Sequence, residues 1–343
     1  MRAIDYIQRV IVRLSGLVEQ LRKTDPGGKG AMKVVTACVR GCELTSIEQN
    51  QERIELLEEI ASLPPDWQPD VILLPGGFFY CPGNIENLQC DGLKRELEEQ
   101  PFSGACASAA KKTGALVVVG VDGQNSGVGG QNTQQACIAW GSDGIVGIGR
   151  KVFPVKGGEA NEMLVHVEDF GSSQRLVRIP GKESTALLCA CYDIYGCKPN
   201  KSNDSRKLSC RGQVEQSPAH ERRSQRFLEW VGQGRRGWDR LVGRAGLALS
   251  AVHYFSRSGP YSGIGRFGRH GVRGASKYVG GRLAFAAAHF EQLPRTFDTQ
   301  CLAAKGGDRL QPTLHFYLDA SHSPSSRENR EGDDVALVRL FLG

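Results

Sequence analysis

The sequence lacks the marks of a membrane protein and of a small disulfide-bonded protein. Its apolar runs fall well short of the roughly 18 residues that a membrane-spanning helix needs. The 11 cysteines are an odd number, which excludes a fully paired framework, and no two have the Cys-x-x-Cys spacing typical of zinc ribbons. The N-terminus has no continuous apolar stretch of the kind found in secretion signals. We therefore expect a cytoplasmic protein with reduced thiols.

Aromatic residues are also scarce, at 7% of the 343 residues, and there are only three methionines. Hydrophobic residues nevertheless reach 40%, which excludes intrinsic disorder for the chain as a whole. Glycine is abundant: its 43 residues exceed the usual share of about 7% and predict many turns and close backbone approaches. A chain of this length has room for two domains or for one large α/β domain.

The net charge of +6 is concentrated in one segment. Residues 198–244 contain 12 Lys and Arg against five Asp and Glu, a net charge of +7, so the rest of the chain is close to neutral. The segment also holds Phe227, Trp230 and Trp238, and basic residues mixed with aromatic ones occur in nucleic-acid-binding proteins. Charge alone is a weak indicator of such binding. We interpret the segment as a polar excursion on the surface and do not expect nucleic acid as a partner.

Hydrophobic periodicity predicts strands and helices in alternation. Short apolar runs bounded by Gly, Pro or Asn are typical of buried strands, and apolar residues three or four apart are typical of helices. This order, followed by hairpins, favours an α/β fold with helices over the faces of the sheet. The expected strands are 33–39, 70–75, 115–121, 134–140, 145–152, 176–179, 185–191, 247–255, 283–290, 313–318 and 335–342. The expected helices are 1–23, 47–61, 91–112 and 218–231.

The chain is expected to divide near residue 31, after a Gly-rich break. Residues 1–31 form an amphipathic helical extension in this prediction, which packs on the body or on a partner and not on a membrane. Residues 32–343 form one domain that includes the polar excursion 198–244. Met32 is an alternative start of the protein, so an added extension and a start at Met32 both stay open.

The strongest candidate for chemistry is a thiol at the end of a predicted strand. Cys191 ends the apolar run 187–191 and is followed by Tyr192 and Asp193. A nucleophile is commonly placed where a buried strand enters a loop, although buried cysteines are more commonly inert. A nearby positive charge activates a thiol by stabilising the thiolate. Lys151, at the end of the predicted hairpin, offers one such charge.

Four segments, in this order, resemble the nitrilase or carbon–nitrogen hydrolase superfamily. They are Val71–Pro75, the block 132–151 with Asp143-Gly144 and Arg150-Lys151, Glu159, and Cys191-Tyr192-Asp193. The resemblance implies a nitrilase-like four-layer αββα sandwich and the hydrolysis of a small amide or nitrile through a covalent thioester. It assigns Cys191 as the nucleophile, Lys151 as the oxyanion-binding lysine and Glu159 as a supporting carboxylate. It implies no metal or organic cofactor. Members of the family often pair their subunits, so the resemblance allows a homodimer, and the oligomeric state stays open.

One position departs from the pattern of that superfamily. There the apolar strand ends in Pro-Glu and the glutamate is the general base, whereas here Pro75 is followed by Gly76 and Gly77. A positioned acid or base contributes about 10²–10⁴-fold to a rate. Its loss predicts a weak or altered catalyst, unless Glu159 takes over the role. The alternative function is that of a catalytically impaired member serving as a binding or interaction protein.

Two histidines offer a different partner for the thiol. His253 and His289 each end an apolar strand, and a Cys–His hydrolase would use such a residue as its base. Histidine at a strand end is more commonly structural, because imidazole readily hydrogen-bonds to the backbone, and we interpret both residues in this way. They lack the local spacing of a metal site. The Gly-x-Gly-x-x-Gly of 263–268 follows a polar turn and not a strand, so it does not indicate a dinucleotide site.

Overall fold

The computed structural model describes residues 31–40, 47–62, 68–83, 90–123, 135–153, 169, 171–198, 236–254, 267–290, 301–318 and 336–343. The predicted helices 1–23 and 218–231 lie outside these residues, as does most of the polar excursion. Glu159 also lies outside them. The proposed division of the chain at residue 31 therefore stays a prediction.

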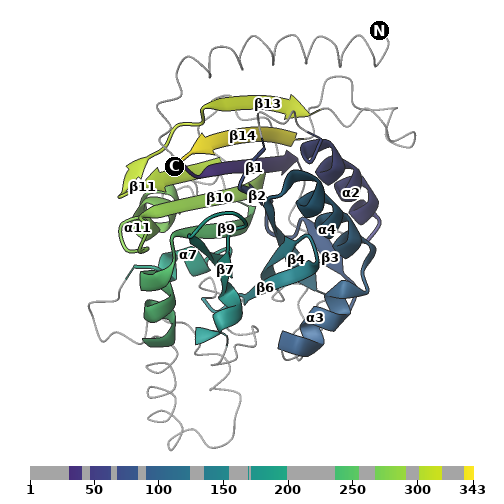
Figure 1. Ribbon diagram of the computed structural model, residues 1–343, viewed down its shortest axis with the longest axis horizontal. Helices are drawn as coiled ribbons and strands as arrows, with labels where there is room; N and C mark the ends of the chain where they lie inside the picture. The colour runs from purple at the N-terminus through teal and green to yellow at the C-terminus, as the bar shows by residue number, and fades with distance from the viewer. Residues whose placement is uncertain are drawn as a thin grey trace, which may run out of the picture.

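The described part of the chain is a mixed α/β structure built on one large sheet (Figure 1). Its strands are β1 (Lys33–Arg40), β2 (Val71–Leu73), β3 (Phe79–Cys81), β4 (Leu116–Gly123), β5 (Gln135–Gly141), β6 (Gly144–Arg150), β7 (Leu176–Arg178), β8 (Thr185–Ala190), β9 (Leu247–Tyr254), β10 (Leu283–Phe290), β11 (Cys301–Lys305), β12 (Asp308–Arg309), β13 (Leu314–Leu318) and β14 (Ala336–Leu342). The central order is β6-β5-β4-β2-β1-β10-β9-β8-β7. The strands predicted from the apolar runs are confirmed, with shifts of a few residues at their ends.

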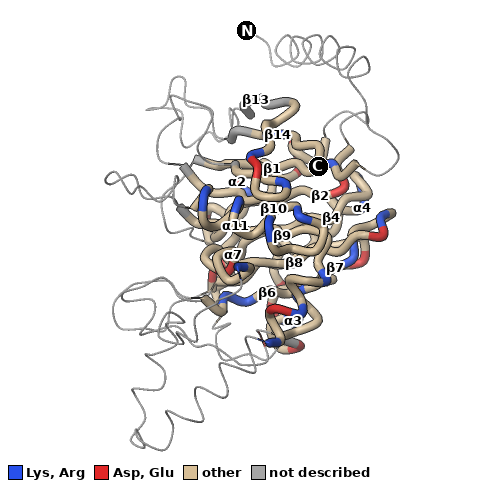
Figure 2. The backbone as a smooth tube through the Cα atoms, turned by 90° about the vertical axis from the view of Figure 1, so that its left-hand side faces the viewer, with Lys and Arg blue, Asp and Glu red and all other residues tan. Residues whose placement is uncertain are grey.

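The middle of the sheet is parallel and its flanks are antiparallel. Strands β4, β2, β1, β10, β9 and β8 are parallel neighbours, and β5, β6 and β7 add antiparallel pairs at the two ends. Strands β2, β8, β9 and β10 carry no Lys, Arg, Asp or Glu, and they are tan in Figure 2. This composition fits strands that are covered on both faces. Parallel pairing brings the carboxyl ends of β2, β4, β8 and β9 to the same edge of the sheet.

The last described strand completes the sheet beside the first. β14 pairs antiparallel with β1 along its length, from Lys33 opposite Leu342 to Val39 opposite Ala336. One end of the pair is closed by two backbone hydrogen bonds, from Met32 N to Gly343 O at 3.0 Å and from Gly343 N to Met32 O at 2.9 Å. β13 then pairs with the outer edge of β14.

Helices flank the sheet on opposite sides, as Figure 1 shows. On one side lie α2 (Gln49–Ile60), α3 (Cys90–Glu98) and α4 (Pro101–Thr113). On the other lie α7 (Asp193–Gly196), η4 (Phe267–Val272) and α11 (Arg273–Ala275). A further helix runs over residues 236–244. Within the described ranges, no helix has the length and apolar character to cross a membrane.

The prediction of a single helix over 91–112 is wrong, because the chain forms two helices there, α3 and α4. Gln100 is extended, with φ −80° and ψ 140°, and Pro101 opens α4 at its first turn. Proline has no N–H to donate and disfavours helical geometry in the residue before it. A proline at this position therefore ends one helix and begins the next.

Three apolar clusters form the core, and one of them lies between the two halves of the sheet. The first is formed by α2 and α4 with the strands they cover, and the second by α7, helix 236–244 and η4 with β8, β9 and β10. The third joins side chains of β1, β2 and β4 to side chains of β8, β9 and β10. Gly149 allows the close approach of β6 to β8, because a Cβ there would lie 2.8 Å from the carbonyl oxygen of Leu188. The sheet therefore curls until its ends face each other.

Candidate active site

Cys191 lies in a sharp turn immediately after β8. Its φ of 46° is left-handed, a conformation that among the described non-glycine residues only Cys191 and Arg282 adopt. Such a conformation costs on the order of 1–3 kcal/mol and is concentrated at functional sites. Two hydrogen bonds to β9 hold the turn: Cys191 N donates to Ala251 O at 2.7 Å, and Ser250 Oγ donates to Cys191 O at 3.0 Å.

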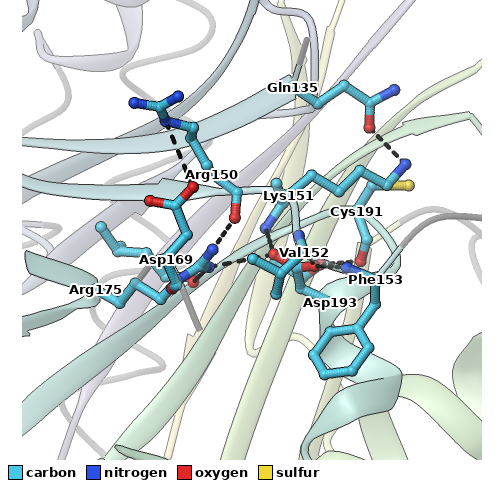
Figure 3. Close-up of polar contacts among 12 residues, drawn as sticks. Gln135, Arg150, Lys151, Val152, Phe153, Asp169, Arg175, Cys191 and Asp193 are labelled. Atoms are coloured by element: carbon cyan, nitrogen blue, oxygen red, sulfur yellow. Dashed lines mark hydrogen bonds and ion pairs between the residues drawn. The ribbon is translucent and has the colours of Figure 1, made fainter. Parts of the chain in front are cut away.

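Asp193 joins this turn to the end of β6, as Figure 3 shows. One carboxylate oxygen accepts hydrogen bonds from the N–H groups of Val152 and Phe153, both at 2.9 Å. The other oxygen accepts from Ala190 N at 3.2 Å and pairs with Arg175 Nη1 at 3.2 Å. Burial raises the pKa of Asp193, and the charge of Arg175 and the two backbone donors oppose that rise. The carboxylate thus fixes the strand ends that carry Lys151 and Cys191 relative to each other.

Arg175 supports the same junction from the opposite side. Its side chain is fully buried, and it donates to the carbonyl oxygens of Arg150, Asp169 and Leu188. Its guanidinium also lies over the ring of Trp238, 5.2 Å from the ring centroid. A buried charge is tolerated when it is paired and hydrogen-bonded, and Arg175 satisfies both conditions. The strands on either side of the site are thereby held rigidly.

Lys151 follows β6 and is almost completely buried, with 4% of its surface exposed. Its backbone N–H donates to Gln135 O at 2.9 Å, and its ammonium donates to Gln135 Oε1 at 2.7 Å. In Figure 3 the long side chain extends from the end of β6 toward Cys191. The positive charge of Lys151 also acts on Asp193. The structure thus brings together two of the three predicted site residues, while Glu159 lies outside the described residues.

Gly76 lies at the site with no room for a side chain. Its N–H donates to Val252 O at 3.0 Å, and the neighbouring Pro75 O accepts a hydrogen bond from Gly120 N at 3.0 Å. A Cβ at position 76 would lie 2.7 Å from Nδ1 of His253 and 2.8 Å from its backbone nitrogen. Real Cβ atoms essentially never come that close. The space that a longer residue would need after Pro75 is therefore occupied by β9 and the imidazole of His253.

His253 pairs with a buried carboxylate, whereas the sequence suggested backbone hydrogen bonds. Its Nε2 lies 2.6 and 2.7 Å from the two carboxylate oxygens of Asp122, at the end of β4. Asp122 is 1% exposed, and the His253 side chain is 16% exposed. Burial lowers the pKa of His253, but the charge of Asp122, its hydrogen bond and the Cys191 thiol outweigh this and raise that pKa to about 10.

His289 behaves differently, although it also lies near Gly76. Burial lowers its pKa well below the ordinary value, and the positive charges of Arg53 and His253 add to that effect. Hydrogen bonds to the backbone of Gly76 and Val39 act in the opposite direction. His289 is therefore a neutral, buried imidazole, in agreement with the structural role interpreted from the sequence.

Asp122 is the residue that sequence reasoning missed. It directly follows the apolar run of β4, so a carboxylate at the carboxyl end of a parallel strand was a visible signal. Its partner could not be seen, because His253 lies 131 residues further along the chain. Among the described residues, no group of three or more His, Cys, Asp and Glu is arranged to hold a metal ion.

No protein-family model and no curated protein sequence matches the chain. The structure is similar to solved structures of an amidase from Nesterenkonia sp. AN1. One of these is a variant carrying the acetamide moiety of fluoroacetamide on the active-site cysteine (11% identity, 91% of both chains, TM-score 0.48). Another is an alanine variant of the same enzyme (11% identity, 91% of this chain and 92% of that chain, TM-score 0.47). A glutamine-dependent NAD(+) synthetase from Cytophaga hutchinsonii is also similar (14% identity, 82% of this chain and 40% of that chain, TM-score 0.44). The solved structures similar to this chain thus include a member of the nitrilase superfamily, the superfamily that its sequence motifs resemble.

Proposed function

We propose that the protein is a cysteine-dependent carbon–nitrogen hydrolase acting on a small amide or nitrile. The observation that carries the proposal is the arrangement around Cys191. The thiol sits in a strained, left-handed turn, and one buried carboxylate, Asp193, ties that turn to the strand end bearing Lys151. A fixed thiol beside a fixed ammonium is what covalent catalysis at a carbonyl or nitrile carbon requires.

The residues divide the chemistry of amide hydrolysis between them. The thiolate of Cys191 attacks the amide carbon and forms a tetrahedral intermediate. The ammonium of Lys151 and the backbone N–H of Tyr192 stabilise the negative charge that develops on the oxygen. Ammonia or an amine then leaves, and water hydrolyses the resulting thioester. Neither a metal ion nor an organic cofactor takes part in this scheme.

The proposal includes the finer predictions that the sequence made. We infer a four-layer αββα sandwich, which the three apolar clusters support because one lies between two halves of the sheet and the others lie under helices. We also propose Glu159 as the supporting carboxylate, as the sequence predicted. A cytoplasmic homodimer, with residues 198–244 as a polar excursion on its surface, completes the proposal.

One observation favours a second function, that of a catalytically impaired binding protein. Gly76 stands where the superfamily pattern has its glutamate, and no side chain fits there without displacing His253. Under this alternative the site binds an amide-bearing ligand and does not turn it over.

A substrate panel with intact-mass detection separates these functions. The wild-type protein and Cys191→Ala are incubated with small aliphatic and aromatic amides and nitriles, and both released ammonia and covalent adducts are measured. The hydrolase predicts a thioester adduct and turnover that Cys191→Ala abolishes. Cys106→Ala is the matched control, because Cys106 is a buried thiol of α4 whose pKa is raised well above its ordinary value by burial. Wild-type protein that binds amides but gives neither adduct nor turnover on the whole panel would refute the hydrolase.

A further inference from the structure

We propose that His253 is the acid–base residue of this site, oriented by Asp122, and that it occupies the space that Gly76 leaves free. The inference rests on the proposed hydrolase function and supplies the proton transfers which that function needs. It assigns a catalytic role to His253, which would exchange protons with the reacting groups, and a positioning role to Asp122.

The first step of the argument is the fit between His253 and Gly76. The imidazole lies so close to Gly76 that a Cβ there would approach Nδ1 to 2.7 Å. On the other side of Gly76, a Cβ on Gly120 would lie 2.3 Å from the Cα of Gly76. Two glycines thus let β4, the turn after β2 and β9 come together with the imidazole between them. The imidazole of His253 therefore fits at this place only because residue 76 has no side chain.

The second step is the orientation of the ring. Both oxygens of Asp122 lie within 2.7 Å of Nε2, and the carboxylate is shielded from solvent. Gly77 permits this approach, because its φ is 61° and a Cβ there would lie 2.6 Å from Asp122 Oδ2. A buried carboxylate that accepts the N–H of a histidine fixes the ring and stabilises its protonated form. Asp122 therefore has the geometry of the third member of a nucleophile–base–carboxylate set.

The third step is the contact between His253 and the thiol. Strands β8 and β9 are parallel neighbours, with Ala190 opposite Ala251, and Cys191 N donates to Ala251 O, so the turn that holds Cys191 lies beside the end of β9 that carries His253. The thiol is close enough to act on the pKa of His253, and Nδ1 of the ring is buried with no hydrogen-bond partner among the described residues. The titratable groups around the imidazole and the thiol are Asp122, Lys151, whose side chain extends toward Cys191, and the neutral His289, which Arg53 also affects. An imidazolium beside the thiol stabilises the thiolate.

The proton transfers balance on these residues. Resting Cys191 is a thiolate and His253 an imidazolium. When Cys191 Sγ bonds to the amide carbon, the imidazolium gives its proton to the leaving nitrogen and the C–N bond breaks, which releases ammonia or an amine. The neutral imidazole then takes a proton from water, whose oxygen bonds to the thioester carbon. The C–S bond breaks, and the products are a carboxylic acid and the original thiolate–imidazolium pair.

The test follows the ionisation of Cys191 and needs no substrate. Iodoacetamide alkylates only the thiolate, so its rate on the Cys191 peptide, measured by mass spectrometry against pH, reports the midpoint of thiolate formation. We expect a wild-type midpoint of about 3.5–7.5, the range of thiols beside a positive charge. His253→Gln should move the midpoint upward toward about 8.5, the ordinary value for cysteine. Asp122→Asn should move it in the same direction by less, because the ring remains. His270→Gln, an exposed histidine of η4, is the matched control and should leave it unchanged.

Hydrolysis by the same variants completes the test. His253→Gln should lower kcat/KM by about 10²–10⁴-fold and remove one limb of its pH profile. A midpoint and a pH profile that do not move in His253→Gln would overturn the inference while Cys191-dependent hydrolysis stands. A midpoint that moves in a protein without any amide or nitrile turnover would instead refute the hydrolase. Circular dichroism identifies the variants that fold, and if His253→Gln does not, Asp122→Asn decides by the same readouts.

Discussion

The pairing of His253 with Asp122 predicts an unusual loss of stability above neutral pH. His253 has a pKa of about 10 in the folded chain and about 6.5 in the unfolded chain. Between these values the folded chain holds one proton more than the unfolded chain. Stability then falls as pH rises, with a slope of about 1.4 kcal/mol per pH unit. The contribution is complete below about pH 6.5 and is lost on approach to pH 10.

The magnitude can be worked out for a window between the two pKa values of His253. Between about pH 7 and pH 8.5 the two pKa values of His253 predict a loss of about 2 kcal/mol in the free energy of unfolding. From about pH 7.5 upward the buried thiols add a fall of the same sign, because an unfolded cysteine ionises near pH 8.5, whereas burial raises the pKa of Cys81 to about 11 and that of Cys137 to about 12. Below about pH 6.5 the slope reverses, because His289 stays neutral when folded and takes up a proton when unfolded.

Urea unfolding monitored by tryptophan fluorescence, at half-unit steps across this window, measures the slope. The perturbation is His253→Gln, which keeps a hydrogen-bond donor near Asp122 but cannot be charged. We expect the variant curve to fall by about 2 kcal/mol less than the wild-type curve across this window, because the buried thiols contribute equally to both. His270→Gln, with its exposed side chain, serves as the control and should follow the wild type. A wild-type curve that is flat between about pH 7 and pH 8.5, or an equal slope in His253→Gln, would refute the reasoning.

Three further predictions concern the other residues of the site. Asp193→Asn leaves the buried Arg175 without its ion pair, so we expect a loss of about 3–5 kcal/mol in urea unfolding; a loss below about 1 kcal/mol would contradict the role of Asp193 at the strand junction. Gly76→Ala forces a Cβ to within 2.7 Å of His253 Nδ1 and should cost about 1–3 kcal/mol, whereas Gly104→Ala, in α4 with nothing within 4 Å of its Cβ, should be neutral or stabilising by up to about 1 kcal/mol. Equal effects of the two alanines in thermal unfolding would argue against close packing at Gly76. Lys151→Met should lower kcat/KM on an amide by about 10²–10³-fold, as loss of an oxyanion donor does, while its Cys191 is still alkylated by iodoacetamide; unchanged kcat/KM would remove Lys151 from the proposed mechanism.

Most strands of the sheet were predictable because their signal is local, but β3, β11 and β12 were not predicted. Each buried strand is a short apolar run bounded by turn residues, and Cys191 could be singled out because it ends such a run. The division between α3 and α4 was also present in the sequence, as Pro101, but the helical periodicity on both sides obscured it. Lys151 and Cys191 could be named by order and spacing along the chain.

The partner of the thiol could not be predicted, because it depends on which strands become neighbours. The sequence showed that Gly76 stands where the superfamily pattern has a glutamate, and it showed His253 at the end of a predicted strand. It could not place the imidazole against Gly76, because that contact depends on the way the turn after β2 meets the end of β9. Asp122 could not be identified for the same reason, because its contact is with His253, which lies 131 residues further along the chain.

The pairing of β1 with β14 has a consequence for the synthesis of the protein on the ribosome. β1 is made early, but the strand that covers its edge is the last one described, and the two are joined along seven residue pairs. While synthesis proceeds, β1 therefore presents an open backbone edge to any other extended segment, and such edges invite pairing between chains. The edge of β1 is therefore covered only after the other described strands have been made. A chaperone that shields β1 during translation should accordingly raise the yield of active protein more than one that acts on the finished chain.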